Sequence, residues 1–210
     1  MTQNKGITRF RIINIGTLSM NKFWNETERV RSGTATCTLI EADAKRIIID
    51  PSPTPELLKP QLLNFSGLRP DDIDMVFVTH FHADHRFGLD LFDGKPWLMY
   101  SEGLADWMGR SSNDVDLIKR FLPADNHLPE GIELFPSPGH TNGHCSLITK
   151  TKWGTLIITG DAVMTEEFFN AEEGFHNSVD FRQASETIRN IKESSDLVIP
   201  GHGNYFLNSD

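Results

Sequence analysis

The segment Thr79-His-Phe-His-Ala-Asp-His85 constrains this chain more than any other part of it. Three of the eight histidines and an aspartate lie within six residues, directly after an apolar stretch that predicts a buried strand. Neutral imidazole and carboxylate are the usual zinc ligands. On an extended turn, His80 and His82 would point the same way and share one ion. Adjacent Asp84 and His85 would open the next helix and aim elsewhere, so the spacing indicates two neighbouring metals.

Three further candidate ligands follow later strands. His140 lies in the loop Ser137-Pro-Gly-His-Thr-Asn-Gly-His144, Asp161 ends a buried strand, and His202 lies in Pro200-Gly-His-Gly203. Sites in layered folds gather at the carboxyl ends of strands. We therefore expect these three side chains to join the first cluster.

The pattern along the chain alternates strands with helices, which predicts sheets covered by helices. Strands are expected at residues 7–18, 35–40, 46–50, 74–79, 96–100, 132–135, 145–149, 155–159 and 197–199. Helices are expected at residues 54–65 (closed by Gly67), 87–91 and 178–194. One or two more are expected between Gly103 and Leu128, with Phe121 and Leu122 among their apolar residues. The length suits a single domain over residues 1–210.

Composition excludes several classes of protein. The net charge of −9 and the scattered basic residues disfavour binding to long nucleic acid. No stretch approaches the roughly 20 apolar residues of a membrane span, and no secretory signal is visible, so we expect a cytoplasmic protein without membrane contact. Cys37 and Cys145 are expected to be reduced core residues. No pattern specifies an oligomeric state.

Together these residues resemble the metallo-β-lactamase superfamily, whose signature is H-x-H-x-D-H followed by separated His, Asp and His. The resemblance spans His80 to His202, and the N-terminal strands fit the same fold. It implies a four-layer αββα sandwich. It also implies a first divalent metal on three ligands, a second on three others, and one bridging ligand. His80, His82 and His140 would bind the first metal, and Asp84, His85 and His202 the second. Asp161 would bridge the two.

The resemblance further implies a mechanism. A hydroxide bridging the metals would attack the substrate, and Asp84 would move the proton to the leaving group. Zinc is the expected metal, although the ligands also suit iron or manganese. We expect His144 to have a structural role or to orient a metal ligand, and His127 and His176 to be surface or pocket-lining residues. Phe168, Phe169 and Phe175 are expected in the core or beside the substrate.

Absent features narrow the reaction. A thioesterase of the glyoxalase II type would carry a C-terminal helical domain and a Gly-Cys-Gly-Arg-like loop after Asp161. The missing loop also argues against a persulfide dioxygenase. Diiron flavoproteins replace the second histidine with glutamate, and true β-lactamases lack the bridging aspartate. The segment after Asp161 is similar to that of acyl-homoserine lactonases, but Met164 stands where they have a catalytic tyrosine.

Three functions therefore remain, each acting on a small-molecule substrate or a phosphodiester. The first is hydrolysis of an ester, lactone or thioester. The second is a phosphodiesterase or ribonuclease of the same fold, which a positive rim around the groove would favour. The third is a mononuclear-iron oxidoreductase similar to persulfide dioxygenases, which iron content and oxygen uptake would identify. The segment from Gly103 to Leu128 is expected to border the pocket and to be a candidate lid.

Overall fold

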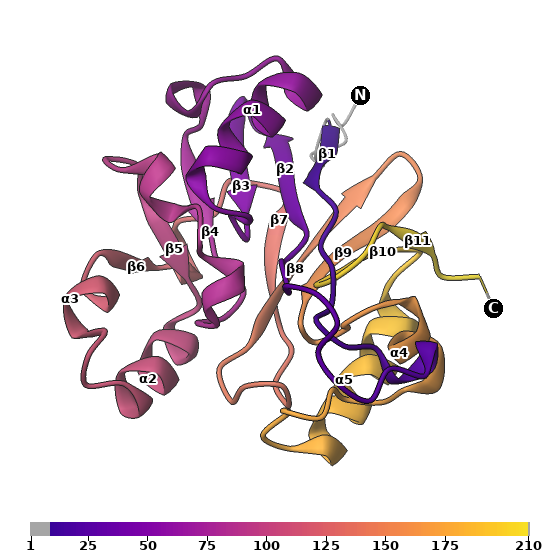
Figure 1. Cartoon of the computed structure of the whole chain (residues 1–210). Coiled ribbons are helices and arrows are strands. Elements are labelled where there is room, and N and C mark those ends of the chain that lie inside the picture. The colour runs from indigo at the N-terminus through magenta and orange to yellow at the C-terminus, as the bar shows by residue number, and fades with distance from the viewer. Residues whose placement is uncertain (1–8, 210) are drawn as a thin grey trace.

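Residues 9–209, which the computed structural model describes, form two β-sheets that pack face to face (Figure 1). The first sheet has the strand order β1-β2-β3-β4-β5-β6, and the second has the order β11-β10-β9-β8-β7. The first sheet's strands are β1 (Arg9–Asn14), β2 (Cys37–Ala42), β3 (Lys45–Ile49), β4 (Met75–Phe77), β5 (Trp97–Met99) and β6 (Phe121–Pro123). The second sheet's strands are β7 (Ile132–Pro136), β8 (Cys145–Thr151), β9 (Gly154–Gly160), β10 (Leu197–Pro200) and β11 (Phe206–Leu207). Both sheets mix antiparallel pairs with parallel ones, as β3 with β4 and β9 with β10.

Helices cover the outer face of each sheet. Figure 1 shows α1 and α2 beside the first sheet and α4 and α5 beside the second. The α-helices are α1 (Pro55–Ser66), α2 (Ser101–Arg110), α3 (Val115–Ile118), α4 (Glu166–Ala171) and α5 (Phe181–Ser194). Short 3-10 helices occupy Lys22–Trp24, Pro70–Asp72, Ala83–His85, Leu89–Phe92 and Ala124–Asn126. This is the αββα sandwich that the sequence predicted.

The four layers follow from the alternation of side chains along the strands. In β3, Ile47 and Ile49 face the second sheet, whereas Ile48 packs with the apolar residues of α1. In β9, Leu156 belongs to the cluster between the sheets and Ile157 to the cluster beneath α5. Each such side chain is fully buried, and burial of an aliphatic side chain stabilises the fold by roughly 1.5–3 kcal/mol.

The helices predicted at residues 54–65 and 178–194 are both present, as α1 and α5. Helix α1 begins with Pro55 at its first position and is closed by Gly67, whose φ of 76° is left-handed. Helix α5 begins at Phe181, three residues later than predicted, because Asp180 accepts a hydrogen bond from the amide of Gln183 (2.9 Å).

Several predictions of individual elements were wrong. Phe121 and Leu122 were expected in a helix, but they form strand β6, which pairs in parallel with β5. The first strand ends at Asn14 rather than at residue 18, and residues 7 and 8 of that prediction lie outside the described residues. The predicted helix at 87–91 is the 3-10 helix Leu89–Phe92. Helix α4 and strand β11 were not predicted at all.

Two simple expectations can also be compared with the fold. Cys37 and Cys145 are free and buried, as predicted. Within residues 9–209, no helix is both long and apolar enough to cross a bilayer.

Candidate metal centre

The seven predicted ligands lie in four loops, each of which follows a strand. The loops after β4, β7, β9 and β10 supply, in that order, His80, His82, Asp84 and His85; His140; Asp161; and His202. Their ligand atoms form two groups, each within 4.8 Å, one of His80, His82, His140 and Asp161 and the other of Asp84, His85 and His202. The structure thus brings together all seven residues that the sequence singled out.

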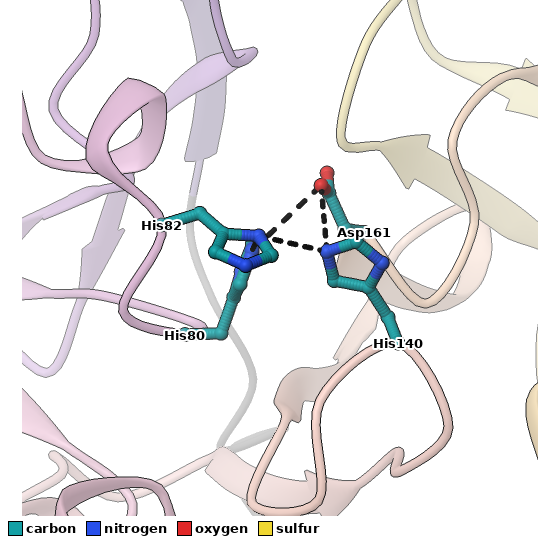
Figure 2. Close-up of side chains that lie close together, drawn as sticks. All are labelled: His80, His82, His140 and Asp161. Carbon is teal, nitrogen blue, oxygen red and sulfur yellow. Dashed lines mark hydrogen bonds and ion pairs between the residues drawn. The ribbon is translucent and has the colours of Figure 1, made fainter. Parts of the chain in front are cut away.

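The first group contains three imidazoles and the carboxylate of Asp161 (Figure 2). Nδ1 of His82 lies 2.9 Å from Nε2 of His80 and 2.9 Å from Nε2 of His140. A neutral ring nitrogen carries at most one proton, so His82 cannot donate a hydrogen bond to both neighbours. Three ring nitrogens that converge on one point are instead a typical arrangement of zinc ligands.

Asp161 belongs to the first group and also faces the second, with one carboxylate oxygen toward the ligands of each. Its Oδ2 lies 3.3 Å from Nε2 of His140 and 3.7 Å from Nε2 of His80. Its Oδ1 lies 2.9 Å from Nε2 of His85 and 3.2 Å from Nε2 of His202. A carboxylate in this position can bind one ion through each oxygen.

Unpartnered buried atoms show that these residues fit cations. Nε2 of His85 and Oδ1 of Asp161 are buried and 2.9 Å apart, but their geometry is not that of a hydrogen bond, and neither makes one with any other described residue. Buried polar atoms without a partner are rare and call for an explanation, such as a bound ion. The nitrogen and oxygen donors suit zinc, iron or manganese.

The histidines of the first group have lowered pKa values, which favours binding of a metal cation. Burial lowers the pKa of His80 and His82, and the neighbouring histidines lower that of His80 further. Burial likewise lowers the pKa of His140 to about 4. These imidazoles are therefore neutral at pH 7 and offer lone pairs to a metal, which binds only the deprotonated ring.

Asp161 stays ionised although it is buried. Burial alone would raise its pKa, but the charges of His85, His202 and His140 hold the pKa well below its usual range. Conversely, burial alone would lower the pKa of His85, but the carboxylates of Asp161 and Asp50 raise it well above its usual range. Asp161 therefore supplies an ionised carboxylate, which favours a bound cation.

Neighbouring groups orient the ligand rings. Nδ1 of His85 lies 2.8 Å from Oδ2 of Asp50, and Nδ1 of His202 lies 2.8 Å from the carbonyl oxygen of Thr34. Partners of this kind fix the tautomer and leave Nε2 free for a metal. The sequence analysis missed Asp50, although it ends a buried strand as Asp161 does, and that shared position was the available signal.

The other histidines lie where the sequence predicted. His144 is buried, with Nδ1 2.8 Å from Oγ of Ser137, and its ring packs 4.9 Å from that of His80. The hydrogen bond between Ser137 and His144 joins the two ends of the loop that carries His140. His127 and His176 are exposed, and His176 lines the pocket beside the centre.

A pocket of about 360 Å³ opens over the two groups. Its apolar wall consists of Leu18, Phe87, Met164 and Phe175. Its polar lining consists of Ser19, Arg29, His82, Asp84, Asp161, His176, Asn177 and His202. Of the three phenylalanines considered in the sequence, Phe175 thus faces the pocket, whereas Phe168 and Phe169 are core residues.

The segment from Gly103 to Leu128 supplies no residue to this pocket, contrary to expectation. It forms α2, α3 and the edge strand β6, and its Trp107 and Phe121 belong to the core beneath the helices. Helix α2 instead contacts the loop that carries His140. Asp106 accepts hydrogen bonds from the backbone amide and the side-chain amide of Asn142, both 3.2 Å.

Comparisons with known sequences agree with this geometry. The family model of the metallo-beta-lactamase superfamily matches residues 30–202. An N-acyl homoserine lactonase of Bacillus sp is 30% identical over 154 residues, which are 67% of this chain and 60% of that protein. Metallo-beta-lactamase domain-containing protein 1 of Xenopus laevis is 28% identical over 144 residues, 68% of this chain and 59% of that protein. The chain therefore spans about 60% of the length of these relatives.

Solved structures share the fold. A quorum-quenching N-acyl homoserine lactone lactonase matches with a TM-score of 0.71 and 21% identity, covering 97% of this chain and 93% of that one. A dizinc quorum-quenching lactonase with a bound product matches with a TM-score of 0.66 and 15% identity, covering 84% and 80%. At these identities the likeness extends to the fold alone.

Proposed function

Because this chain belongs to the metallo-beta-lactamase superfamily, we propose that it is a dinuclear metal-dependent hydrolase that cleaves an ester, lactone or thioester bond of a small molecule. The observation that carries the proposal is the position of Asp161, whose two carboxylate oxygens face two separate groups of ligands. We assign residues 1–210 to one catalytic domain, because three apolar clusters join every layer of the sandwich within the described residues.

The chain's own residues would divide the work as follows. His80, His82 and His140 would hold one ion, Asp84, His85 and His202 the other, and Asp161 both. Two divalent ions, for which zinc is our proposal, would supply a nucleophile from water at neutral pH and polarise the scissile carbonyl. The carboxylate of Asp84 is 29% exposed and lines the pocket, so it can pass a proton from the attacking water to the leaving group.

The substrate class follows from the pocket and from the relatives. Leu18, Met164 and Phe175 form an apolar wall beside the ligands, which suits the carbon chain of an acyl compound. Two of the similar proteins named above are N-acyl homoserine lactonases. Met164, which is 3% exposed, stands where the resemblance places the lactonase tyrosine. It has no proton to donate, so the oxyanion would depend on other groups in the site.

The test is a comparison of initial rates on four substrates after loading with zinc or manganese. These are an acyl-homoserine lactone, a glutathione thioester, bis-p-nitrophenyl phosphate and a β-lactam. We expect turnover of the lactone or the thioester, lost in Asp84→Asn and retained in Asp90→Asn, whose exposed carboxylate lies outside the pocket. Turnover of the phosphodiester alone would replace this proposal by the phosphodiesterase.

A further inference from the structure

Arg29 is a cation in the pocket wall that has no acidic partner. It is exposed, and within residues 9–209 no carboxylate forms an ion pair with it. The neighbouring cations of the same segment are both paired, Lys22 with Glu173 and Arg31 with Glu26. The segment thus neutralises its other positive charges and leaves this one free at the pocket.

The surroundings make this charge distinctive. Among the described residues, Arg29 is the one lysine or arginine that lines the pocket. The two acidic residues that line the pocket, Asp84 and Asp161, belong to the proposed ligand groups. The whole chain carries a net charge of −9, so its surface as a whole repels anions. Ser19 and Asn177, which also line the pocket, add hydrogen-bond donors to it.

We propose that Arg29 makes the pocket selective for substrates in which an anionic group, a carboxylate or a phosphoryl group, lies away from the bond that is hydrolysed. The planar guanidinium matches both groups with two parallel hydrogen bonds. This inference rests on the proposed hydrolase and narrows its substrate from esters in general to acidic ones. The apolar residues Leu18 and Phe175 then contact the carbon chain between the reacting carbonyl and the anionic end.

The test uses two chromogenic esters of similar size, p-nitrophenyl butyrate, which is neutral, and mono-p-nitrophenyl glutarate, which ends in a carboxylate. We expect the wild-type protein to have the lower KM for the glutarate. Arg29→Gln should raise that KM roughly tenfold, the loss of about one charged hydrogen bond, and leave the butyrate nearly unchanged. Arg29→Lys should restore part of the difference, and the wild-type KM for the glutarate should rise with salt.

A matched control and a second readout separate the possible failures. Arg182→Gln removes the same charge from a side chain that is 90% exposed outside the pocket, and should change neither KM. Calorimetric titration with glutarate monobenzylamide measures anion binding without hydrolysis, and Arg29→Gln should weaken it. If both esters are cleaved but Arg29→Gln affects them equally, the anionic selectivity is wrong and the hydrolase stands. If neither ester is cleaved, the hydrolase is in question, and unaltered glutarate binding in Arg29→Gln overturns the inference as well.

The source of the anionic group is settled by a third ester. In p-nitrophenyl 4-phosphonobutyrate a phosphonate replaces the carboxylate. A lower KM than for the glutarate, lost in Arg29→Gln, assigns the position to a phosphoryl group. A higher one assigns it to a carboxylate.

Discussion

The carboxylate of Asp50 lies 2.8 Å from Nδ1 of His85, and it also holds the end of the neighbouring strand. It accepts hydrogen bonds from the backbone amide of Thr79 (2.8 Å) and from the Thr79 hydroxyl (2.9 Å). Asp50 is 2% exposed and follows β3 directly, whereas Thr79 precedes the histidine cluster after β4. One buried side chain thus links two adjacent parallel strands to the second group of proposed ligands.

Replacing Asp50 by asparagine should lower the affinity for the second metal. The amide cannot accept from Thr79 and His85 as a carboxylate does, and loss of such an orienting partner typically costs roughly 10–100-fold in metal affinity. Competition with a chromogenic chelator measures both binding constants. Asp43→Asn, in an exposed turn whose positive φ asparagine tolerates, is the control. Equal affinities in the two variants would show that Asp50 serves the fold alone.

Asp161→Asn should reduce the metal content from two ions to one per chain. Asparagine keeps one oxygen, so it can serve one ligand group, but its amide nitrogen cannot bind a cation in place of the other oxygen. Elemental analysis after dialysis measures the stoichiometry, with circular dichroism to confirm that the variant is folded. A wild-type protein that holds a single ion would contradict the prediction from the outset.

Gly201→Ala should damage the centre through a steric contact. A Cβ at residue 201 would collide with Oδ1 of Asp161 and with the carbonyl of Gly160. We expect a loss of about 1–3 kcal/mol in the free energy of unfolding, together with weaker metal binding. Gly109→Ala, in α2 with nothing near its added Cβ, should instead raise the stability by up to about 1 kcal/mol. Urea denaturation of both variants provides the comparison, and equal shifts would refute it.

The thiols should resist labelling in the folded protein. Burial raises the pKa of Cys37 to about 12 and that of Cys145 to about 12. An unfolded thiol ionises near pH 8.5, so at about pH 8 only the unfolded chain offers an appreciable fraction of reactive thiolate. Ellman's reagent should detect no thiol in native protein and two in guanidinium chloride. Rapid labelling of either cysteine in the native protein would contradict the assigned burial.

The residues of the centre could be predicted from the sequence more completely than the helices and strands around it. The strands before His80, Asp161 and His202 are short and strongly apolar, and their period was enough to place the ligands at strand ends. Phe121 and Leu122 have the same apolar character, but their pairing with β5 is a long-range contact that no local pattern encodes. The bonds of Asp50 could not be predicted for the same reason, because they join segments 29 and 35 residues apart.

The segment predicted as a candidate lid contains most of α2, which contacts the loop of His140, and the last prediction follows from this contact. Asp106 of α2 binds Asn142 through both its backbone and side-chain amides, and Arg110 donates to the same carboxylate (2.7 Å). Asn142 lies two residues after His140, so Asp106→Ala should loosen that loop alone. We expect weaker affinity for the first metal and unchanged affinity for the second in a stepwise titration. Asp116→Ala, whose carboxylate is fully exposed on α3, should leave both constants as they are. If Asp106→Ala weakens both metals equally, α2 supports the whole centre rather than the loop of His140.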